Sequence, residues 1–328
     1  MVGSMTILVA PFPVGLAALV TLFHQPPIVL ATYSAGIVIL ILGFIRAFRV
    51  DIPRARGLDR AVCLGPVLYA APLAVFSAEH FTATRNIASL VPGWIPWHIF
   101  WALFVGVALI SAALSFAVHR VTGLAAALLG IMFFLFVVLM DVEGLARHLH
   151  NRFAQALTLR ELTFSACAFG LAATLVNDRW RSAAVRIAVV ARCVVGFAFV
   201  FYGVEHFLHP GYAPVIPLEL QLPAYIPFRW LWAYGLGALE VAGGLAMLAN
   251  WHARTAATSL GIAACFVTLV VYGPILAVHP ADVDVALNYF ADTLCFGGAV
   301  LCLAASIPPA YRARLAVAIP AASSTASV

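Results

Sequence analysis

Residues 122–140 read TGLAAALLGIMFFLFVVLM, and none of these 19 side chains carries a charge. A helix needs about 20 apolar residues to cross a bilayer, so this stretch is long enough to span one. The whole chain shares its character: 64% of the 328 residues are hydrophobic, 9% are charged, and the mean hydropathy is +1.04. Soluble domains carry about 25% charged residues, so the composition excludes that class.

Similar apolar runs, bounded by charge, proline or glycine, recur along the chain. Because lipid offers no hydrogen-bond partner to the backbone, runs of this length must be helices. The sequence therefore predicts an all-α polytopic membrane protein in contact with the lipid bilayer. Nine spans are predicted, at about 28–45, 61–80, 98–118, 122–140, 159–176, 186–206, 230–249, 255–276 and 287–305. A tenth candidate, 5–23, lacks the basic start of a signal peptide and is read as a further helix.

The distribution of arginine indicates which side of the membrane each loop lies on. All 18 basic residues of the chain are arginines. Five of them lie within residues 46–60. If that segment is cytoplasmic, alternation of the nine spans places 12 arginines on its side and five on the other, as the positive-inside rule expects. This bias predicts a bacterial inner-membrane protein with a cytoplasmic, disordered tail at 307–328. It also accounts for the net charge of +5 without nucleic acid as a partner.

The residue types that carry metal or cofactor chemistry are not clustered in the sequence. The six cysteines all lie in apolar runs, with no CxxC pair and no Cys/His cluster, so neither a disulfide scaffold nor a metal site is predicted. The chain also lacks a phosphate loop, a nucleophile elbow and a haem-binding Cys-His motif. No specific reaction or cofactor follows from these patterns.

A Glu-His pair ends an apolar run twice, in FSAEHFTA at 76–83 and in FYGVEHFLHP at 201–210. A shift of 126 aligns the two pairs, and a shift of 131 aligns the helices that follow. The second shift matches Trp101 with Trp232, Gly106 with Gly237, His148 with His279, and Glu161 with Asp292. We therefore predict two four-helix copies, 61–177 and 186–306, after an N-terminal transmembrane extension and basic loop at 1–60. Because four is even, both copies have the same orientation, as in a parallel repeat.

Three stretches of the second copy resemble the DoxX-like family of four-helix membrane proteins. They read GVEHFLHPGYAPVIP, LPAYIP and YGLGALEVAGGLAML. The matching positions are Glu205, His206, Pro210, Pro217, Pro227, Glu240, Gly243 and Gly244. The first copy keeps AEHF and VPGWIP but has Leu109 where Glu240 would fall, so it looks like a diverged relative. The resemblance implies a four-helix bundle fold and an association with quinol-linked redox systems.

Glu240 is the foremost candidate site residue, because it lies in the middle of the span 230–249. An ionised carboxylate there costs several kcal/mol, so Glu240 must face the bundle interior, stay protonated or find a partner. Small residues flank it, as is typical of close helix packing. It is either a hydrogen-bonded contact between helices or a proton relay and ligand contact. Donors such as Tyr202 or Tyr272 are the expected partners.

Glu205 and His206 are the other two candidates. The sequence places them at the outer interface, where charge costs little, as anchors or as a proton-exchanging pair. Five prolines stiffen the loop that follows, which is predicted to form a lid over the bundle. Glu161 and Asp292 are expected to cap the starts of their helices, with Arg160 as a candidate partner of Glu161.

Three hypotheses for function remain open at this stage. The first is a redox-associated membrane component that meets quinone or an electron-transfer partner through the second copy. The second is a transporter or small-solute pathway at the interface of the two copies. The third is a membrane scaffold without a ligand.

Overall fold

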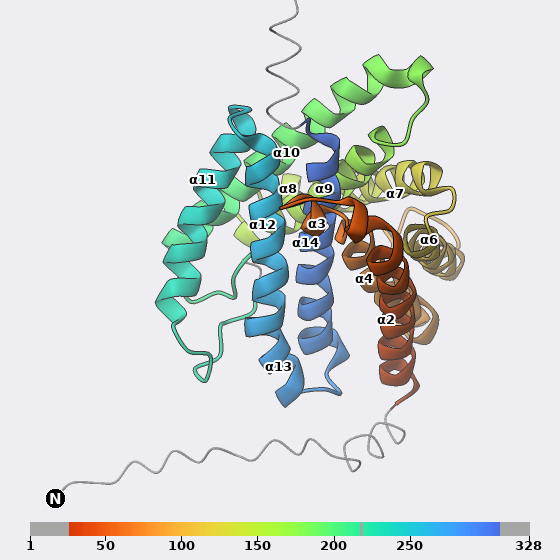
Figure 1. Ribbon diagram of the computed structural model, residues 1–328. Helices are drawn as coiled ribbons and strands as arrows, with labels where there is room; N and C mark the ends of the chain where they lie inside the picture. Colours follow the sequence, from red (N-terminus) through yellow and green to blue (C-terminus); the bar gives the residue numbers. More distant parts are fainter. Residues whose placement is uncertain (1–25, 217–218, 309–328) are drawn as a thin grey trace, which may run out of the picture.

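The computed structural model describes residues 26–216 and 219–308 (Figure 1). Within this part of the chain, nine helical segments are long and apolar enough to cross a membrane. The predicted all-α polytopic fold is therefore confirmed. The tenth candidate at 5–23, Pro217 and the tail from residue 309 lie outside the described residues.

The helices before and within the first predicted copy run from residue 27 to residue 173. They are α2 (Pro27–Arg46), η1 (Ala47–Asp51), η2 (Ile52–Arg54), α3 (Asp59–Val62), α4 (Gly65–Thr82), α5 (Thr84–Ala88), α6 (His98–Val118), α7 (Thr122–Phe136), η3 (Val137–Asp141), α8 (Val142–Arg147) and α9 (Arg152–Ala173). We call α4 to α9 the first unit. Its last long helix begins seven residues earlier than the predicted span at 159, at Arg152.

The remaining helices run from residue 178 to residue 306. They are η4 (Asp178–Trp180), α10 (Arg181–Leu208), η5 (Leu231–Gly235), α11 (Leu236–Leu248), α12 (Ala253–Val267), η6 (Thr268–Tyr272), α13 (Gly273–Val278), η7 (Val283–Leu287) and α14 (Asn288–Ser306). We call α10 to α14 the second unit. All six cysteines are free: Cys63 directly follows α3, Cys167 lies in α9, and the other four lie in α10, α12 and α14.

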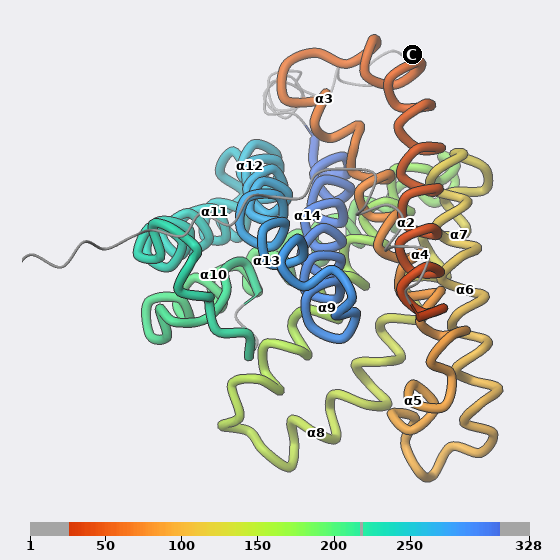
Figure 2. The backbone as a smooth tube through the Cα atoms, turned by 90° about the horizontal axis from the view of Figure 1, so that it is seen from below, coloured from red at the N-terminus to blue at the C-terminus, as the bar shows by residue number. Residues whose placement is uncertain are grey.

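The helices are arranged around a central pair, α9 and α14, the last long helix of each unit (Figure 2). In each unit the first helix packs on the second, the second on the third and the third on the fourth. The first helix of each unit also packs against the last helix of the other, so α4 contacts α14 and α10 contacts α9. Helix α2 lies outside this arrangement, against α4 and α6. The two units are therefore interlocked rather than merely adjacent.

Unusual backbone conformations recur at the shift of 131 that the sequence predicts. Positive φ angles occur at Trp97, His119 and Val121, and again at Phe228, Asn250 and His252. The π-helical turns η3 and η6 are also 131 residues apart. Non-glycine residues rarely adopt positive φ, so three such matches support a common origin of the two units.

Glycines set the distances between several helices. A Cβ atom on Gly298 would collide with the backbone of Leu68 and Tyr69, so this glycine lets α14 approach α4 closely. A Cβ atom on Gly203 would stand 2.6 Å from the carbonyl oxygen of Gly237, which joins α10 to α11. Small residues at such contacts are typical of helix packing in membranes.

We call the side on which α4 and α10 end the Glu-His side; α9 and η7 begin there. It lies at the bottom of Figure 1 and faces the viewer in Figure 2. Because consecutive spans alternate in direction, both Glu-His pairs reach this same side.

Candidate functional site

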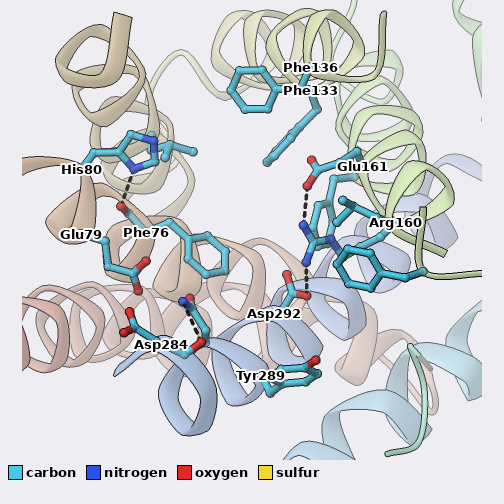
Figure 3. A pocket seen from close by; sticks show the side chains of 15 residues that line it. Phe76, Glu79, His80, Phe133, Phe136, Arg160, Glu161, Asp284, Tyr289 and Asp292 are labelled. Carbon is cyan, nitrogen blue, oxygen red and sulfur yellow. Dashed lines mark hydrogen bonds and ion pairs between the residues drawn. The ribbon is translucent and has the colours of Figure 1, made fainter. Parts of the chain in front are cut away.

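A cavity of about 350 Å³ lies in the first unit, where it meets the start of α14 (Figure 3). Aromatic rings make up much of its wall, together with four carboxyl groups and a single arginine among the described residues. Its lining residues are Phe76, Glu79, His80, Leu109, Phe133, Phe136, Phe153, Leu157, Arg160, Glu161, Phe164, Asp284, Asn288, Tyr289 and Asp292. Its volume falls within the range of about 300–1,000 Å³ that is typical of ligand pockets.

One wall of the cavity is an ion cluster on the central helix pair, which we call the Arg160 cluster. The guanidinium of Arg160 donates to Asp292 Oδ2 at 2.6 Å and to Glu161 Oε1 at 2.7 Å. Glu161 belongs to α9 and Asp292 to α14, so a single arginine joins the two units. Arginine suits this role because its planar fork can bind two carboxylates at once.

The Arg160 cluster corrects the expectation that Glu161 and Asp292 cap helix ends. Glu161 is the tenth residue of α9, and η7 precedes α14, so both carboxylates lie more than two turns inside their spans. The expected pairing of Arg160 with Glu161 is confirmed. The sequence signal was available, because Glu161 and Asp292 match at the shift of 131 and Arg160 adjoins the first of them.

Glu79 occupies the opposite wall, next to Asp284 (Figure 3). Glu79 is only 9% exposed, and its Oε1 has no hydrogen-bond partner among the described residues. Asp284 is exposed, so this wall leads from the buried carboxylate to the surface on the Glu-His side. The neighbouring His80 contacts the carbonyl oxygen of Phe76 through Nδ1 at 2.7 Å, which leaves Nε2 as its second polar atom. A buried carboxylate oxygen without a hydrogen-bond partner is costly, and so points to a ligand or a proton.

Glu205, the counterpart of Glu79, has a different environment. Arg152 Nε donates to Glu205 Oε2 at 2.9 Å, and the guanidinium carbon of Arg152 lies 3.8 Å from the centroid of the Tyr212 ring. His209 Nε2 lies 3.8 Å from the same carboxylate oxygen. The predicted site residue Glu205 therefore belongs to an ion pair between α10 and α9, rather than to a free interfacial anchor.

His206 and Glu240 form a second buried pair. His206 Nε2 lies 3.4 Å from Glu240 Oε2, and the two side chains are 0% and 1% exposed. This corrects one expectation: Glu240 faces His206 rather than a tyrosine. His206 itself is buried between helices near the end of α10. The hydroxyl groups of Tyr202 and Tyr272 instead donate to the carbonyl oxygens of Ala156 and Pro214. Within the described part of the chain, neither His206 nor Glu240 has a side-chain hydrogen bond.

The loop at 209–230, which we call the cover loop, closes the second unit. Its Ala213, Val215 and Ile216 are buried. Tyr272 holds it by a hydrogen bond to Pro214, and the backbone N–H of Leu220 donates to the hydroxyl of Tyr289. The prediction of a lid agrees with this packing. In the first unit the matching segment is shorter by five residues.

These features define the class of protein: an integral, multi-pass, helical membrane protein with polar groups buried between two interlocked four-helix units. The chain matches no protein-family model, no curated protein and no solved structure. The resemblance to the DoxX-like family therefore stays a prediction from the residues quoted above.

Proposed function

We propose that the protein binds a small solute in the cavity and provides a solute pathway at the interface of its two units. The observation that carries this proposal is the buried carboxylate of Glu79, whose Oε1 has no hydrogen-bond partner among the described residues, in a cavity of about 350 Å³. A concave site with few convergent polar groups in an apolar wall is the usual form of a ligand pocket.

The electrostatics of the cavity favour a ligand over a purely structural role. Four carboxyl groups face one guanidinium, and both terminal nitrogens of Arg160 are already bound within the Arg160 cluster. Glu79 lies across from that cluster and is buried, so a proton or a bound group must balance its charge in a low-dielectric site.

A binding screen with a cavity-filling variant tests the proposal. Protein in lipid nanodiscs is heated with small amines, alcohols, carboxylates and a short-chain quinone and quinol. A compound present at 100 times its Kd stabilises the protein by about 2.7 kcal/mol. Leu109→Trp fills the cavity and should abolish this shift.

Leu103→Trp is the matched control for that screen, because Leu103 is on the same helix but 38% exposed. It should bind like the wild type. If no compound shifts the unfolding temperature, or if Leu109→Trp binds as well as Leu103→Trp, the proposal is wrong.

A quinone-linked redox component is the second candidate function. The observation that favours it is His80 beside Glu79 in a cavity rich in phenylalanine. A quinol hydroxyl can donate to a carboxylate or to an imidazole nitrogen, and its ring packs against aromatic side chains. Stabilisation by the quinol alone, lost in Leu109→Trp, would favour this candidate.

We also propose that the membrane is the bacterial inner membrane, with the Glu-His side outward and the C-terminus in the cytoplasm. The arginine distribution supports this orientation. Single cysteines at 54, 181, 147 and 209, in a cysteine-free background, test it by labelling in intact cells. Positions 147 and 209 should react with an impermeant reagent, while 54 and 181 should react only after lysis; labelling of 54 and 209 from one side would overturn the orientation.

A further inference from the structure

The two Glu-His pairs differ in one charged group. Glu205 on α10 is bound by Arg152 of α9, the last long helix of the other unit. Glu79 on α4 packs in the same way against α14. The shift of 131 aligns Arg152 with Val283, the first residue of η7, so the span formed by η7 and α14 supplies no arginine there. Glu79 has instead Asp284 and Asn288 as polar neighbours around the cavity.

We propose that the cavity takes a small organic cation, a guanidinium or primary ammonium compound with an apolar part, and that its charged group binds Glu79. This inference rests on the proposed function and names the chemical class of the solute. The exogenous cation takes the place that the Arg152 side chain holds in the second unit.

The second unit shows how such a cation is held. There a guanidinium lies between the carboxylate of Glu205 and the ring of Tyr212, with an ion-pair distance of 2.9 Å and a ring-centroid distance of 3.8 Å. Charge-assisted hydrogen bonds and cation–π contacts both stabilise this arrangement. The cavity offers the same two elements, the carboxylate of Glu79 and the nearby ring of Phe76 (Figure 3).

The rest of the cavity fits the apolar part of such a compound. Phe133 and Phe136 line it on the side away from Glu79 and Asp284 (Figure 3), and Phe153 is a further aromatic residue of the lining. Asp284 is exposed on the Glu-His side, where its charge attracts cations from water towards Glu79. An inorganic cation is a poorer match, because hard metal ions take six or more oxygen ligands. No group of three metal-binding side chains occurs within residues 26–216 and 219–308.

The test measures binding of four probes to the full-length protein in nanodiscs by calorimetry. Benzylammonium and methylguanidinium are the cations, and benzyl alcohol and phenylacetate are the neutral and anionic comparisons. The cations should bind best. Glu79→Gln, which keeps the shape of the side chain, should weaken their binding by about tenfold or more, since it removes a charge-assisted contact.

Two further variants make this test specific. Glu143→Gln removes an exposed carboxylate in α8 and should leave binding unchanged. Asn288→Arg places an internal guanidinium beside Glu79 and should abolish binding of both cations while the protein keeps its unfolding temperature.

The outcomes separate this inference from the proposed function. If benzyl alcohol or a quinol binds as well as the cations, and Leu109→Trp abolishes that binding, the cavity is a ligand site but the cation inference is wrong. If Glu79→Gln binds the cations like the wild type, the inference is also wrong. If none of the probes or screened compounds binds, both the inference and the proposed function fail.

Discussion

The first and second units each contain a Glu-His pair, a glycine packed against its histidine, and turns with positive φ at matching positions. Within the described residues, an arginine binds the glutamate of the second pair but not that of the first. A Cβ atom on Gly106 would lie 2.9 Å from the Cβ of His80, and one on Gly237 would lie 3.1 Å from that of His206. In the second unit, Arg152 binds the glutamate, Glu240 faces the histidine and the cover loop lies above. In the first unit, Leu109 replaces Glu240 and the cavity remains. The same framework thus supports a closed unit and an open one.

The difference shows how a duplicated fold divides its roles. Glu205 of the second unit is bound by Arg152, which α9 of the first unit supplies. Among the described residues, no arginine binds the corresponding buried carboxylate of Glu79 in the first unit. Four experiments address this comparison, in order of decreasing expected effect.

Arg160→Leu should have the largest effect, because the Arg160 cluster joins the two units. It leaves Glu161 and Asp292 buried without their cation, which costs about 3–5 kcal/mol. Unfolding of the protein in mixed micelles by increasing SDS measures the loss. Arg147→Leu is the control: it breaks the exposed pair with Glu143 and should cost about 0–1 kcal/mol. Equal losses in the two variants would show that the cluster does not hold the units together.

Glu240→Leu copies Leu109 of the first unit into the second. It leaves buried His206 without the carboxyl group that lies 3.4 Å from its Nε2 and should destabilise the protein by about 1–3 kcal/mol. Adding His206→Leu should recover part of this loss, because replacing both partners by apolar groups is nearly neutral. The double-mutant cycle is measured by the same SDS titration. A coupling energy near zero would mean that the 3.4 Å approach of the two side chains contributes nothing.

Gly203→Ser copies Ser77, its counterpart in the first unit. Ser77 donates a hydrogen bond to the carbonyl oxygen of Gly106 at 2.8 Å, whereas Gly203 lies directly against the backbone of Gly237. The serine should therefore overpack the α10–α11 contact and cost about 1–3 kcal/mol. Ser77→Gly, the reverse change, should cost about 1 kcal/mol through its lost hydrogen bond. If Gly203→Ser does not change stability in the SDS titration, the α10–α11 contact has room for a serine, as the α4–α6 contact has at Ser77, and the expected difference in packing is wrong.

Arg152→Ala should have the smallest effect on stability and the most direct bearing on the comparison. The Arg152–Glu205 pair is partly exposed, so its loss should cost about 1 kcal/mol. Methylguanidinium should restore the unfolding temperature of this variant by occupying the vacated place. The double variant Arg152→Ala/Glu205→Gln is the control and should show no recovery. Equal recovery in both would mean that the carboxylate does not select the cation.

Much of the fold could be predicted from the sequence, because apolar runs of about 20 residues must form helices to satisfy their backbone hydrogen bonds in lipid. The shift of 131 predicted a repeat that recurs in the backbone at Trp97 and Phe228, among others. The site was harder, because charge inside a membrane is placed by tertiary packing. Glu161 near a predicted span start resembled a cap, and only the interlocking of α9 with α14 shows it bound, with Asp292, to one arginine.

The partner of His206 is also determined by tertiary packing and not by its neighbours in the sequence. It adjoins Glu205 in the sequence, but successive residues on a helix point to different faces. Glu205 therefore reaches Arg152 on α9, while His206 turns towards Glu240 on α11. The sequence predicts one polar site at this end of the span, whereas the structure places its two residues in two separate sites. The cavity itself could not be predicted, because it depends on how the side chains around Glu79 pack and how much space they leave.

The interlocked helices also determine when the protein can be completed during its synthesis. The ribosome delivers Arg160 with α9, but Asp292 arrives only with α14, the last of the spans within the described residues. Helix α4, synthesised much earlier, likewise waits for Gly298 to bring α14 against Tyr69. The nascent chain must therefore keep its early helices in the membrane without this neighbour until α14 has been synthesised. A chain that stops before residue 283 retains the Arg160 guanidinium with only one of its two carboxylate partners.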